Sequence, residues 1–156
     1  MDKSIVYVDM DDVLCDYATA YKKALTLYPE ITYPQSQPNF FLELIPLPGA
    51  LSTFNYLLAS SHYEPYILTA PSVENPLCYT EKRLWVERHL SFEVTNRLII
   101  CPNKGLLKGD ILIDDWDVGR GQENFEGVLI KFGSTEYPNW HKVNEYLQAL
   151  ESGLAL

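Results

Sequence analysis

The sequence predicts an α/β fold in which helices pack against a five-stranded parallel sheet. Short runs of β-branched and aromatic residues alternate along the chain with longer segments whose apolar residues recur every three or four positions. Strands that alternate with helices in this way form parallel sheets through right-handed crossovers. At 156 residues, 47% of them hydrophobic, the chain suffices for a single domain, residues 1–156, with a sizeable core.

The first strand is predicted at residues 5–8, where Ile, Val, Tyr and Val follow one another, and we expect it to be buried on both faces. Apolar residues between Leu14 and Tyr28 then recur at helical spacing. Pro29 ends this helix, because proline cannot continue the hydrogen-bond ladder. The chain therefore begins with a strand–helix unit.

Residues 29–48 combine five prolines with a group of large apolar side chains. This segment is too apolar for a disordered linker, so a compact insert over a binding site is predicted, with an ordinary packed loop as the alternative. Phe40 and Phe41 are candidates either to stack on a substrate base or to fill the core.

The remaining elements alternate in the same manner up to the C-terminus. Their apolar patterns predict a helix at 49–62, a strand at 63–68, a helix at 75–90, strands at 97–101, 111–113 and 128–132, and a helix at 140–150. Asn139 is the expected cap of the last helix.

Composition excludes several classes of function. The net charge of −9 argues against a nucleic-acid polymer as partner, although a mononucleotide needs only a local cationic pocket. The cysteines, Cys15, Cys78 and Cys101, form no Cys-x-x-Cys pair, so we expect reduced, mostly buried thiols in a cytosol-like compartment. No signal-peptide pattern and no run of ~18 apolar residues occur, which predicts a cytoplasmic protein without a membrane partner.

Polar residues of the types that a phosphoryl-transfer site needs follow several of the predicted strands. The first strand leads to Asp9 and Asp11, the second ends in Thr69, Lys104 follows the third, and the fourth ends in Asp114 and Asp115. Carboxylates crowded at the carboxyl edge of a sheet repel one another unless a hard cation such as Mg²⁺ lies between them. Phosphoryl transfer needs a metal, a cation and hydrogen-bond donors in this arrangement.

This order of motifs resembles the haloacid-dehalogenase-like (HAD) phosphohydrolases. The matching segments are Asp9-Met10-Asp11-x-Val13-Leu14, Ile67-Leu68-Thr69, Lys104 and Ile113-Asp114-Asp115. More narrowly, the chain resembles the 5'(3')-deoxyribonucleotidases in three further segments, namely Phe40-Phe41 through Pro48-Gly49-Ala50, Leu68-Thr69-Ala70-Pro71, and Glu81-Lys82-x-x-Trp85-Val86. The resemblance implies a three-layer, Rossmann-like α/β/α fold with a five-stranded parallel sheet and a small cap insert at about residues 17–48.

The resemblance also implies catalytic roles. Asp9 would attack the phosphorus, and Asp11 would act first as general acid and then as general base. The resemblance places Mg²⁺ on the Asp9 carboxylate, the Asp11 backbone carbonyl and Asp114, with Asp115 in a supporting position.

Further residues are implied to bind the substrate. Thr69, the Ala70 N–H and Lys104 would hold the phosphate, with Lys108 as the competitor of Lys104. Lys82 is a substrate-binding candidate, although a lysine on a helix usually faces solvent. His62, His89 and His141 match no motif, so surface or core positions are expected for all three.

The expected activity is Mg²⁺-dependent hydrolysis of a nucleoside monophosphate. Two alternatives stay open: hydrolysis of another small phosphomonoester, and a non-catalytic protein that keeps the metal and phosphate site. The family usually has glycine where this chain has Asp12, which adds negative charge near the metal and favours the second alternative. The sequence leaves the oligomeric state open, with a homodimer as one option.

Overall fold

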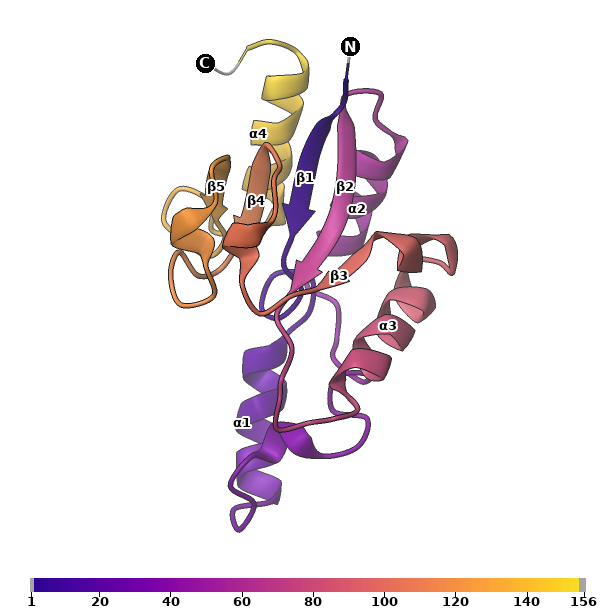
Figure 1. Ribbon diagram of the computed structural model, residues 1–156, viewed down its shortest axis with the longest axis vertical. Helices are drawn as coiled ribbons and strands as arrows, with labels where there is room; N and C mark the ends of the chain where they lie inside the picture. Colours follow the sequence, from indigo (N-terminus) through magenta and orange to yellow (C-terminus); the bar gives the residue numbers. More distant parts are fainter. Residues whose placement is uncertain (1, 155–156) are drawn as a thin grey trace.

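The computed structural model describes residues 2–154 and contains one twisted parallel sheet (Figure 1). Its strands lie in the order β3-β2-β1-β4-β5, which leaves β1 at the centre. The strands are β1 (Ser4–Val8), β2 (Tyr63–Thr69), β3 (Leu98–Ile100), β4 (Ile111–Asp114) and β5 (Val128–Lys131). This confirms the α/β class and the five-stranded parallel sheet.

Within residues 2–154, four α-helices occur at the predicted places. They are α1 (Tyr17–Leu27), α2 (Ala50–Ala59), α3 (Cys78–His89) and α4 (Trp140–Glu151). Asn139 caps α4 as predicted, since its side chain accepts a hydrogen bond from Lys142 N. Short 3-10 turns add η1 (Pro34–Ser36), η2 (Glu93–Arg97), η3 (Lys104–Leu106) and η4 (Gln122–Asn124). Among residues 2–154, no helix has the length and apolar character needed to cross a bilayer.

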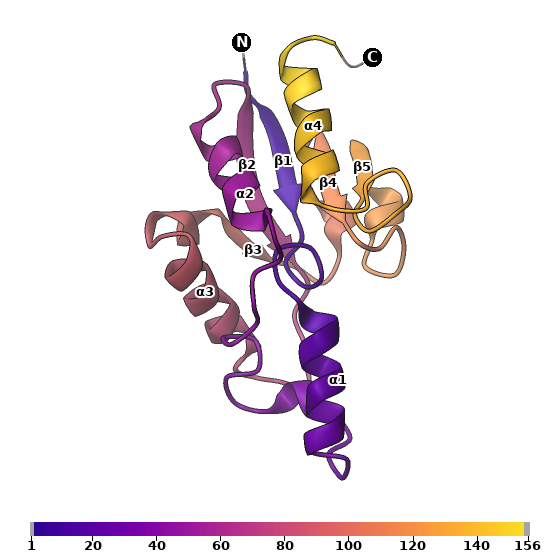
Figure 2. The ribbon, with the colours of Figure 1, turned by 180° about the vertical axis from the view of Figure 1, so that it is seen from behind.

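The two faces of the sheet are covered differently. Helices α2 and α4 lie against one face (Figure 2), and residues of α3 join the same large core. On the other face, Tyr7, Leu68 and Leu112 pack against loop residues such as Leu107 and Phe125. The connections at 101–110 and 115–127 carry only η3 and η4. The first of them is shorter than the roughly dozen residues that a helical crossover needs. That outer layer therefore consists of loops and 3-10 turns.

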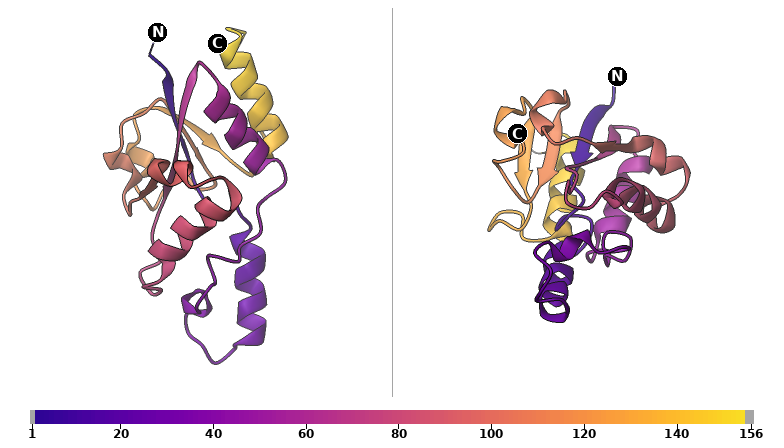
Figure 3. Two further views of the ribbon diagram at one scale, coloured as in Figure 1. Left: turned by 90° about the vertical axis from the view of Figure 1, so that its right-hand side faces the viewer. Right: turned by 60° about the horizontal axis from the view of Figure 1, so that its bottom comes forward.

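Helix α1 and the segment that follows it lie beyond the carboxyl ends of the strands (Figure 3). Two buried tryptophans attach this region to the body. The indole N–H of Trp85 donates to Leu44 O at 2.7 Å, and that of Trp140 donates to Val13 O at 2.7 Å. The loop after β1 and the end of the insert are thereby held in fixed positions at the carboxyl edge.

Candidate active site

Asp9 and Asp11 lie in the tight turn that follows β1. The N–H of Asp9 donates to Ile113 O at 2.9 Å, so the β-ladder places Asp9 beside the end of β4. Met10 O then accepts hydrogen bonds from Leu14 N and Cys15 N, which closes the turn. Asp12 has a left-handed φ of 59°, a conformation that Asp adopts more readily than most residues.

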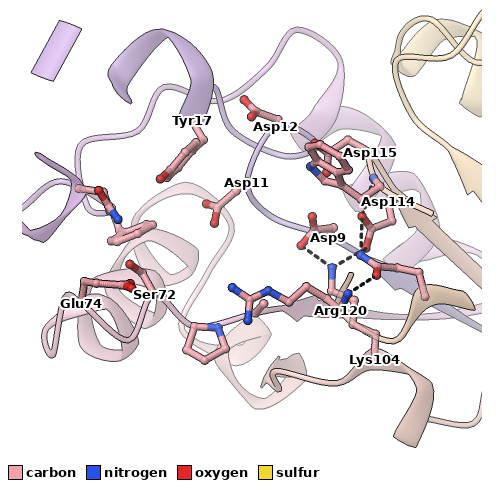
Figure 4. Close-up of a pocket in the computed structure, with 16 residues that line it drawn as sticks. Asp9, Asp11, Asp12, Tyr17, Ser72, Glu74, Lys104, Asp114, Asp115 and Arg120 are labelled. Carbon is pink, nitrogen blue, oxygen red and sulfur yellow. Dashed lines mark hydrogen bonds and ion pairs between the residues drawn. The ribbon is translucent and has the colours of Figure 1, made fainter. Parts of the chain in front are cut away.

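Lys104 is buried between Asp9 and Asp114, and these three residues are called the Lys104 cluster below. Its ammonium group lies 2.9 Å from Asp9 Oδ1 and 2.5 Å from Asp114 Oδ2 (Figure 4). Burial alone would lower the pKa of Lys104, but the two carboxylates outweigh it and the pKa is raised. Lys104 therefore stays charged and offsets the repulsion between two carboxylates.

Three carboxylates of the site are arranged to hold a cation. Asp9, Asp114 and Asp115 each offer an oxygen within 4.8 Å of the others. Both oxygens of Asp114 already accept hydrogen bonds from Lys104, Gln122 and Trp116 N. In contrast, Asp115 Oδ1 is buried without a hydrogen-bond partner.

The pKa values of two of these carboxyls are raised. Burial, together with the neighbouring acids, raises the pKa of Asp9 to about 6 and that of Asp115 to about 8. The strain of holding anionic groups together would be relieved by a hard divalent cation, which prefers carboxylate oxygens. The residues present therefore fit a Mg²⁺ site.

Asp11 is held by a second buried lysine. Lys82 Nζ donates to Asp11 Oδ2 at 2.9 Å, to Thr69 Oγ1 at 2.7 Å and to Ala70 O at 2.8 Å. Its ammonium group also lies 5.1 Å from the centre of the Phe41 ring. Asp11, Thr69, Ala70 and Lys82 are called the Lys82 cluster below.

A cavity of about 380 Å³ opens in front of both aspartates. Its wall includes Asp9, Asp11, Asp12, Tyr17, Phe41, Ala70, Ser72, Lys104, Asp114, Asp115, Trp116 and Arg120. Tyr17 lies beside Asp11 (Figure 4), and burial, followed by the charge of Asp11, raises the pKa of Tyr17. Its hydroxyl is therefore available as a hydrogen-bond donor next to Asp11.

Most of the predicted site residues meet at this cavity, but Thr69, Lys82 and Phe40 do not line it. Thr69 is fully buried and its hydroxyl accepts from Lys82. Phe40 borders a different cavity, on the α1 side of the insert, whereas Phe41 faces the aspartates. Lys108, the competitor of Lys104, is exposed and lies outside the cavity wall, whereas Lys104 is buried.

The other singled-out side chains do not line the cavity. His62 pairs with Glu151, His141 pairs with Glu145, and His89 packs against Trp85, as expected for surface and core histidines. Cys15 and Cys78 are buried as predicted, and Cys101 is partly exposed.

The sequence reasoning missed three residues of the site. The apolar pattern between Leu14 and Tyr28 predicts only that Tyr17 belongs to a helix, although its spacing from Asp11 indicates a position above the strand end. Gln122 and Arg120 come from the β4–β5 connection, where no periodic pattern or motif marks them. Gln122 is buried and donates to both oxygens of Asp114 at 3.3 Å.

Comparison with known proteins identifies relatives over most of the chain. Residues 30–149 match the model of the family described as 5' nucleotidase, deoxy (pyrimidine), cytosolic type C protein. The chain is 38% identical over 149 residues to a putative 5'(3')-deoxyribonucleotidase of the Vibrio phage KVP40, covering 94% of this chain and 85% of the relative. It is 36% identical over 106 residues to the human cytosolic-type 5'(3')-deoxyribonucleotidase, covering 68% of this chain and 47% of the relative.

A solved structure shares the fold. The crystal structure of a HAD family hydrolase from Deinococcus radiodurans, with bound phosphate and sodium, superposes with a TM-score of 0.59 and 12% sequence identity. The match covers 98% of this chain and 97% of the other. At this identity the likeness establishes the HAD fold, and the roles of individual side chains follow from the geometry of this chain.

Proposed function

The chain belongs to the 5' nucleotidase, deoxy (pyrimidine), cytosolic type C family, and from this premise we propose the reaction that it catalyses. The reaction is hydrolysis of the phosphate ester of a nucleoside monophosphate, with deoxyribonucleotides preferred. One observation carries the proposal. Two aspartates separated by one residue face the same cavity, and each is paired with its own buried lysine.

In the first step, a carboxylate oxygen of Asp9 attacks the phosphorus while the bond from phosphorus to the sugar oxygen breaks. Asp11 gives a proton to the leaving sugar oxygen, so a neutral nucleoside departs. Lys82 holds the Asp11 carboxylate from behind at 2.9 Å. We assign Lys82 as a positioning residue that acts through Asp11, since it lies outside the cavity wall.

In the second step, water hydrolyses the aspartyl-phosphate. Asp11, now ionised, takes a proton from the water while the water oxygen forms its bond to phosphorus. The bond between phosphorus and Asp9 breaks, which regenerates the carboxylate and releases inorganic phosphate. Using two steps replaces one difficult displacement by two easier ones.

A Mg²⁺ ion would be held by the carboxylates of Asp9 and Asp115, together with the Asp11 backbone carbonyl. We assign the direct contact to Asp115 rather than to Asp114, because Asp115 Oδ1 has no partner, whereas Asp114 is already engaged with Lys104 and Gln122. When bound, such a cation offsets the repulsion between an anionic nucleophile and an anionic ester.

The substrate's remaining parts would meet groups already on the cavity wall. The Ala70 backbone N–H and Lys104 are proposed to contact phosphate oxygens, while Thr69 orients Lys82. Tyr17 and Phe41 offer aromatic surface for the sugar or base, with ring centroids 6.1 Å apart. The insert at about residues 17–48 thus acts as a small cap in this proposal.

The role of Asp12 bears on the non-catalytic alternative. Asp12 Oδ1 accepts from Ala18 N at 2.8 Å, near the start of α1. This carboxylate therefore serves the helix terminus, where negative charge is favourable. This geometry gives no reason to expect that Asp12 abolishes activity.

The test is phosphate release from purified protein, with Mg²⁺ and with EDTA. The substrates are deoxyribo- and ribonucleoside monophosphates, a sugar phosphate and an aryl phosphate. We expect Mg²⁺-dependent release that favours deoxynucleotides, and its loss in Asp9→Asn. Release from the sugar phosphate alone would keep the chemistry and reject the nucleotide, and no release from any ester would reject the proposal.

A further inference from the structure

The cavity has an excess of negative charge for a site that must admit a phosphate ester. Its wall contains the carboxylates of Asp9, Asp11, Asp12, Glu74, Asp114 and Asp115. The cations on this wall are Lys104 and Arg120. Lys104 is already shared between two carboxylates, and Lys82, behind the wall, is paired with Asp11. Lys104 can therefore meet a phosphate only while it also balances Asp9 and Asp114, and Lys82 does not reach the cavity.

Arg120 differs from both lysines in having no ionic partner. Its side chain is exposed. Among residues 2–154, the arginines that form ion pairs are Arg83, Arg88 and Arg97. Arg120 lines the cavity, and Figure 4 shows its guanidinium group extending in the direction of Ser72, on the same wall as Asp9 and Asp11. A substrate approaching the two aspartates would therefore pass close to this group.

The backbone of Arg120 is bonded to the active site itself. Its N–H donates to Gln122 Oε1 at 2.8 Å, and its carbonyl accepts from Lys104 N at 2.6 Å. Gln122 and Lys104 are also the residues that hold Asp114. The origin of the Arg120 side chain is thus fixed relative to the reacting groups, although it comes from a loop.

The glycine that follows makes this close packing feasible. Gly121 has a φ of +82°, and a Cβ atom there would lie 1.9 Å from Asn103 Oδ1. A side chain at position 121 would push the β4–β5 loop away from the segment that holds Lys104. The loop is therefore built to approach the site and to present Arg120 to it.

We propose that Arg120 binds the phosphate group of the substrate, supplying the unpaired positive charge that Lys104 and Lys82 lack. A guanidinium group presents donors in a planar fork that matches two phosphate oxygens, which a lysine cannot reproduce. This inference rests on the proposed phosphatase function and adds a phosphate-binding residue to it. Arg120 is a binding residue here, with no proton to transfer.

The test compares Arg120→Gln, Arg120→Lys and the control Arg83→Gln. Arg83 is a partly exposed arginine of α3 that pairs with Glu87, away from the cavity. The readouts are kcat/KM for a deoxynucleoside monophosphate and the dissociation constant of inorganic phosphate, measured by calorimetry with Mg²⁺ present. Calorimetry does not depend on turnover, so it separates this inference from the proposed function.

We expect Arg120→Gln to weaken phosphate binding by roughly 10- to 100-fold, the size of one charge-assisted contact. The value of kcat/KM should fall by at least the same factor, Arg120→Lys should recover part of both losses, and Arg83→Gln should match the wild type. Unchanged phosphate affinity in Arg120→Gln would overturn the inference, even if the KM of the nucleotide rose. Weakened phosphate binding in a protein without turnover would keep the inference and reject the phosphatase.

Discussion

The Lys104 cluster and the Lys82 cluster each hold one of the two aspartates after β1, and both lysines are almost fully buried. Their surroundings differ in charge. Lys104 lies between Asp9 and Asp114, which are 7% and 0% exposed. Lys82 has one carboxylate, Asp11, whose side chain is 27% exposed, and two neutral oxygen acceptors.

The difference indicates separate tasks for the two lysines. Lys104 joins residues at the ends of β1 and β4, so its charge keeps the buried carboxylates of Asp9 and Asp114 together. Lys82 joins α3 to the ends of β1 and β2 and also contacts Phe41 of the insert. We therefore expect Lys104 to control the chemistry and Lys82 to control how Asp11 is oriented.

Replacing Lys104 should have the largest effect. Lys104→Met leaves two buried carboxylates without a counterion, so in EDTA we expect a loss of about 3–5 kcal/mol in the free energy of unfolding. With Mg²⁺, kcat should fall by about 10³-fold or more, since a preorganised cation is lost. Urea unfolding and steady-state kinetics measure both effects. Turnover within tenfold of the wild type would contradict the comparison, and the exposed Lys108→Met is the control.

Replacing Lys82 should have a smaller effect on stability. Lys82→Met leaves the oxygen acceptors of Thr69 and Ala70 without their donor and frees Asp11, which can still reach water. We therefore expect the free energy of unfolding to fall by about 1–3 kcal/mol. The fold decrease in kcat should exceed the fold change in KM, because Asp11 loses its orientation. A double-mutant cycle with Asp11→Asn sharpens this: the second substitution should add little to the kinetic effect of the first. Fully additive effects would show that Lys82 acts independently of Asp11.

The residue beside Lys82 tests the attachment of the insert. Glu81 is buried, and its two oxygens accept hydrogen bonds from Asn39 N and Phe41 N. In Glu81→Gln, only one of the two side-chain atoms is still an oxygen that can accept a hydrogen bond. We therefore expect the free energy of unfolding to fall by about 1–2 kcal/mol, and KM to rise with kcat nearly unchanged. Faster hydrogen exchange at the Phe41 amide would accompany it. Glu87→Gln on the same helix is the control. Equal stability and equal KM in the two variants would contradict the claim that Glu81 attaches the insert.

Asp12 should show the smallest effect, and the size of the stability loss depends on the substitute. Asp12→Ala loses the hydrogen bond to Ala18 N and must also adopt the left-handed φ of 59°, at about 1 kcal/mol of strain. Asp12→Gly loses only the hydrogen bond, so it should be the more stable of the two by about that amount in thermal unfolding. Activity should persist in both. A larger loss with glycine than with alanine would contradict the strain argument.

Much of the catalytic edge was predictable, because parallel strands end at one edge and their last residues must lie together. Asp9, Asp114 and Asp115 follow from this rule without any knowledge of loops. Lys82 was harder, since the helical pattern says which residues share a face but not which strand end that face will meet. Only the packing of α3 shows that its lysine lies beneath Asp11.

The loops set the limit of prediction. Phe40 and Phe41 are neighbours in a segment without regular structure, so no periodicity indicates which ring faces the aspartates. Arg120 has no motif, and its position depends on the close contact between Gly121 and Asn103. The sequence also did not decide whether the connections after β3 and β4 form α-helices or the 3-10 turns that the structure contains.

The central claim is that Asp9 carries the phosphoryl group between the two steps. The most direct measurement is rapid acid quenching of the protein during turnover of a deoxynucleoside monophosphate, followed by peptide mass spectrometry. We predict one phosphoryl group on the peptide that contains Asp9, absent in Asp9→Asn. Phosphate release from Asp9→Asn at the wild-type rate, or a phosphoryl group on any other residue, would contradict the account.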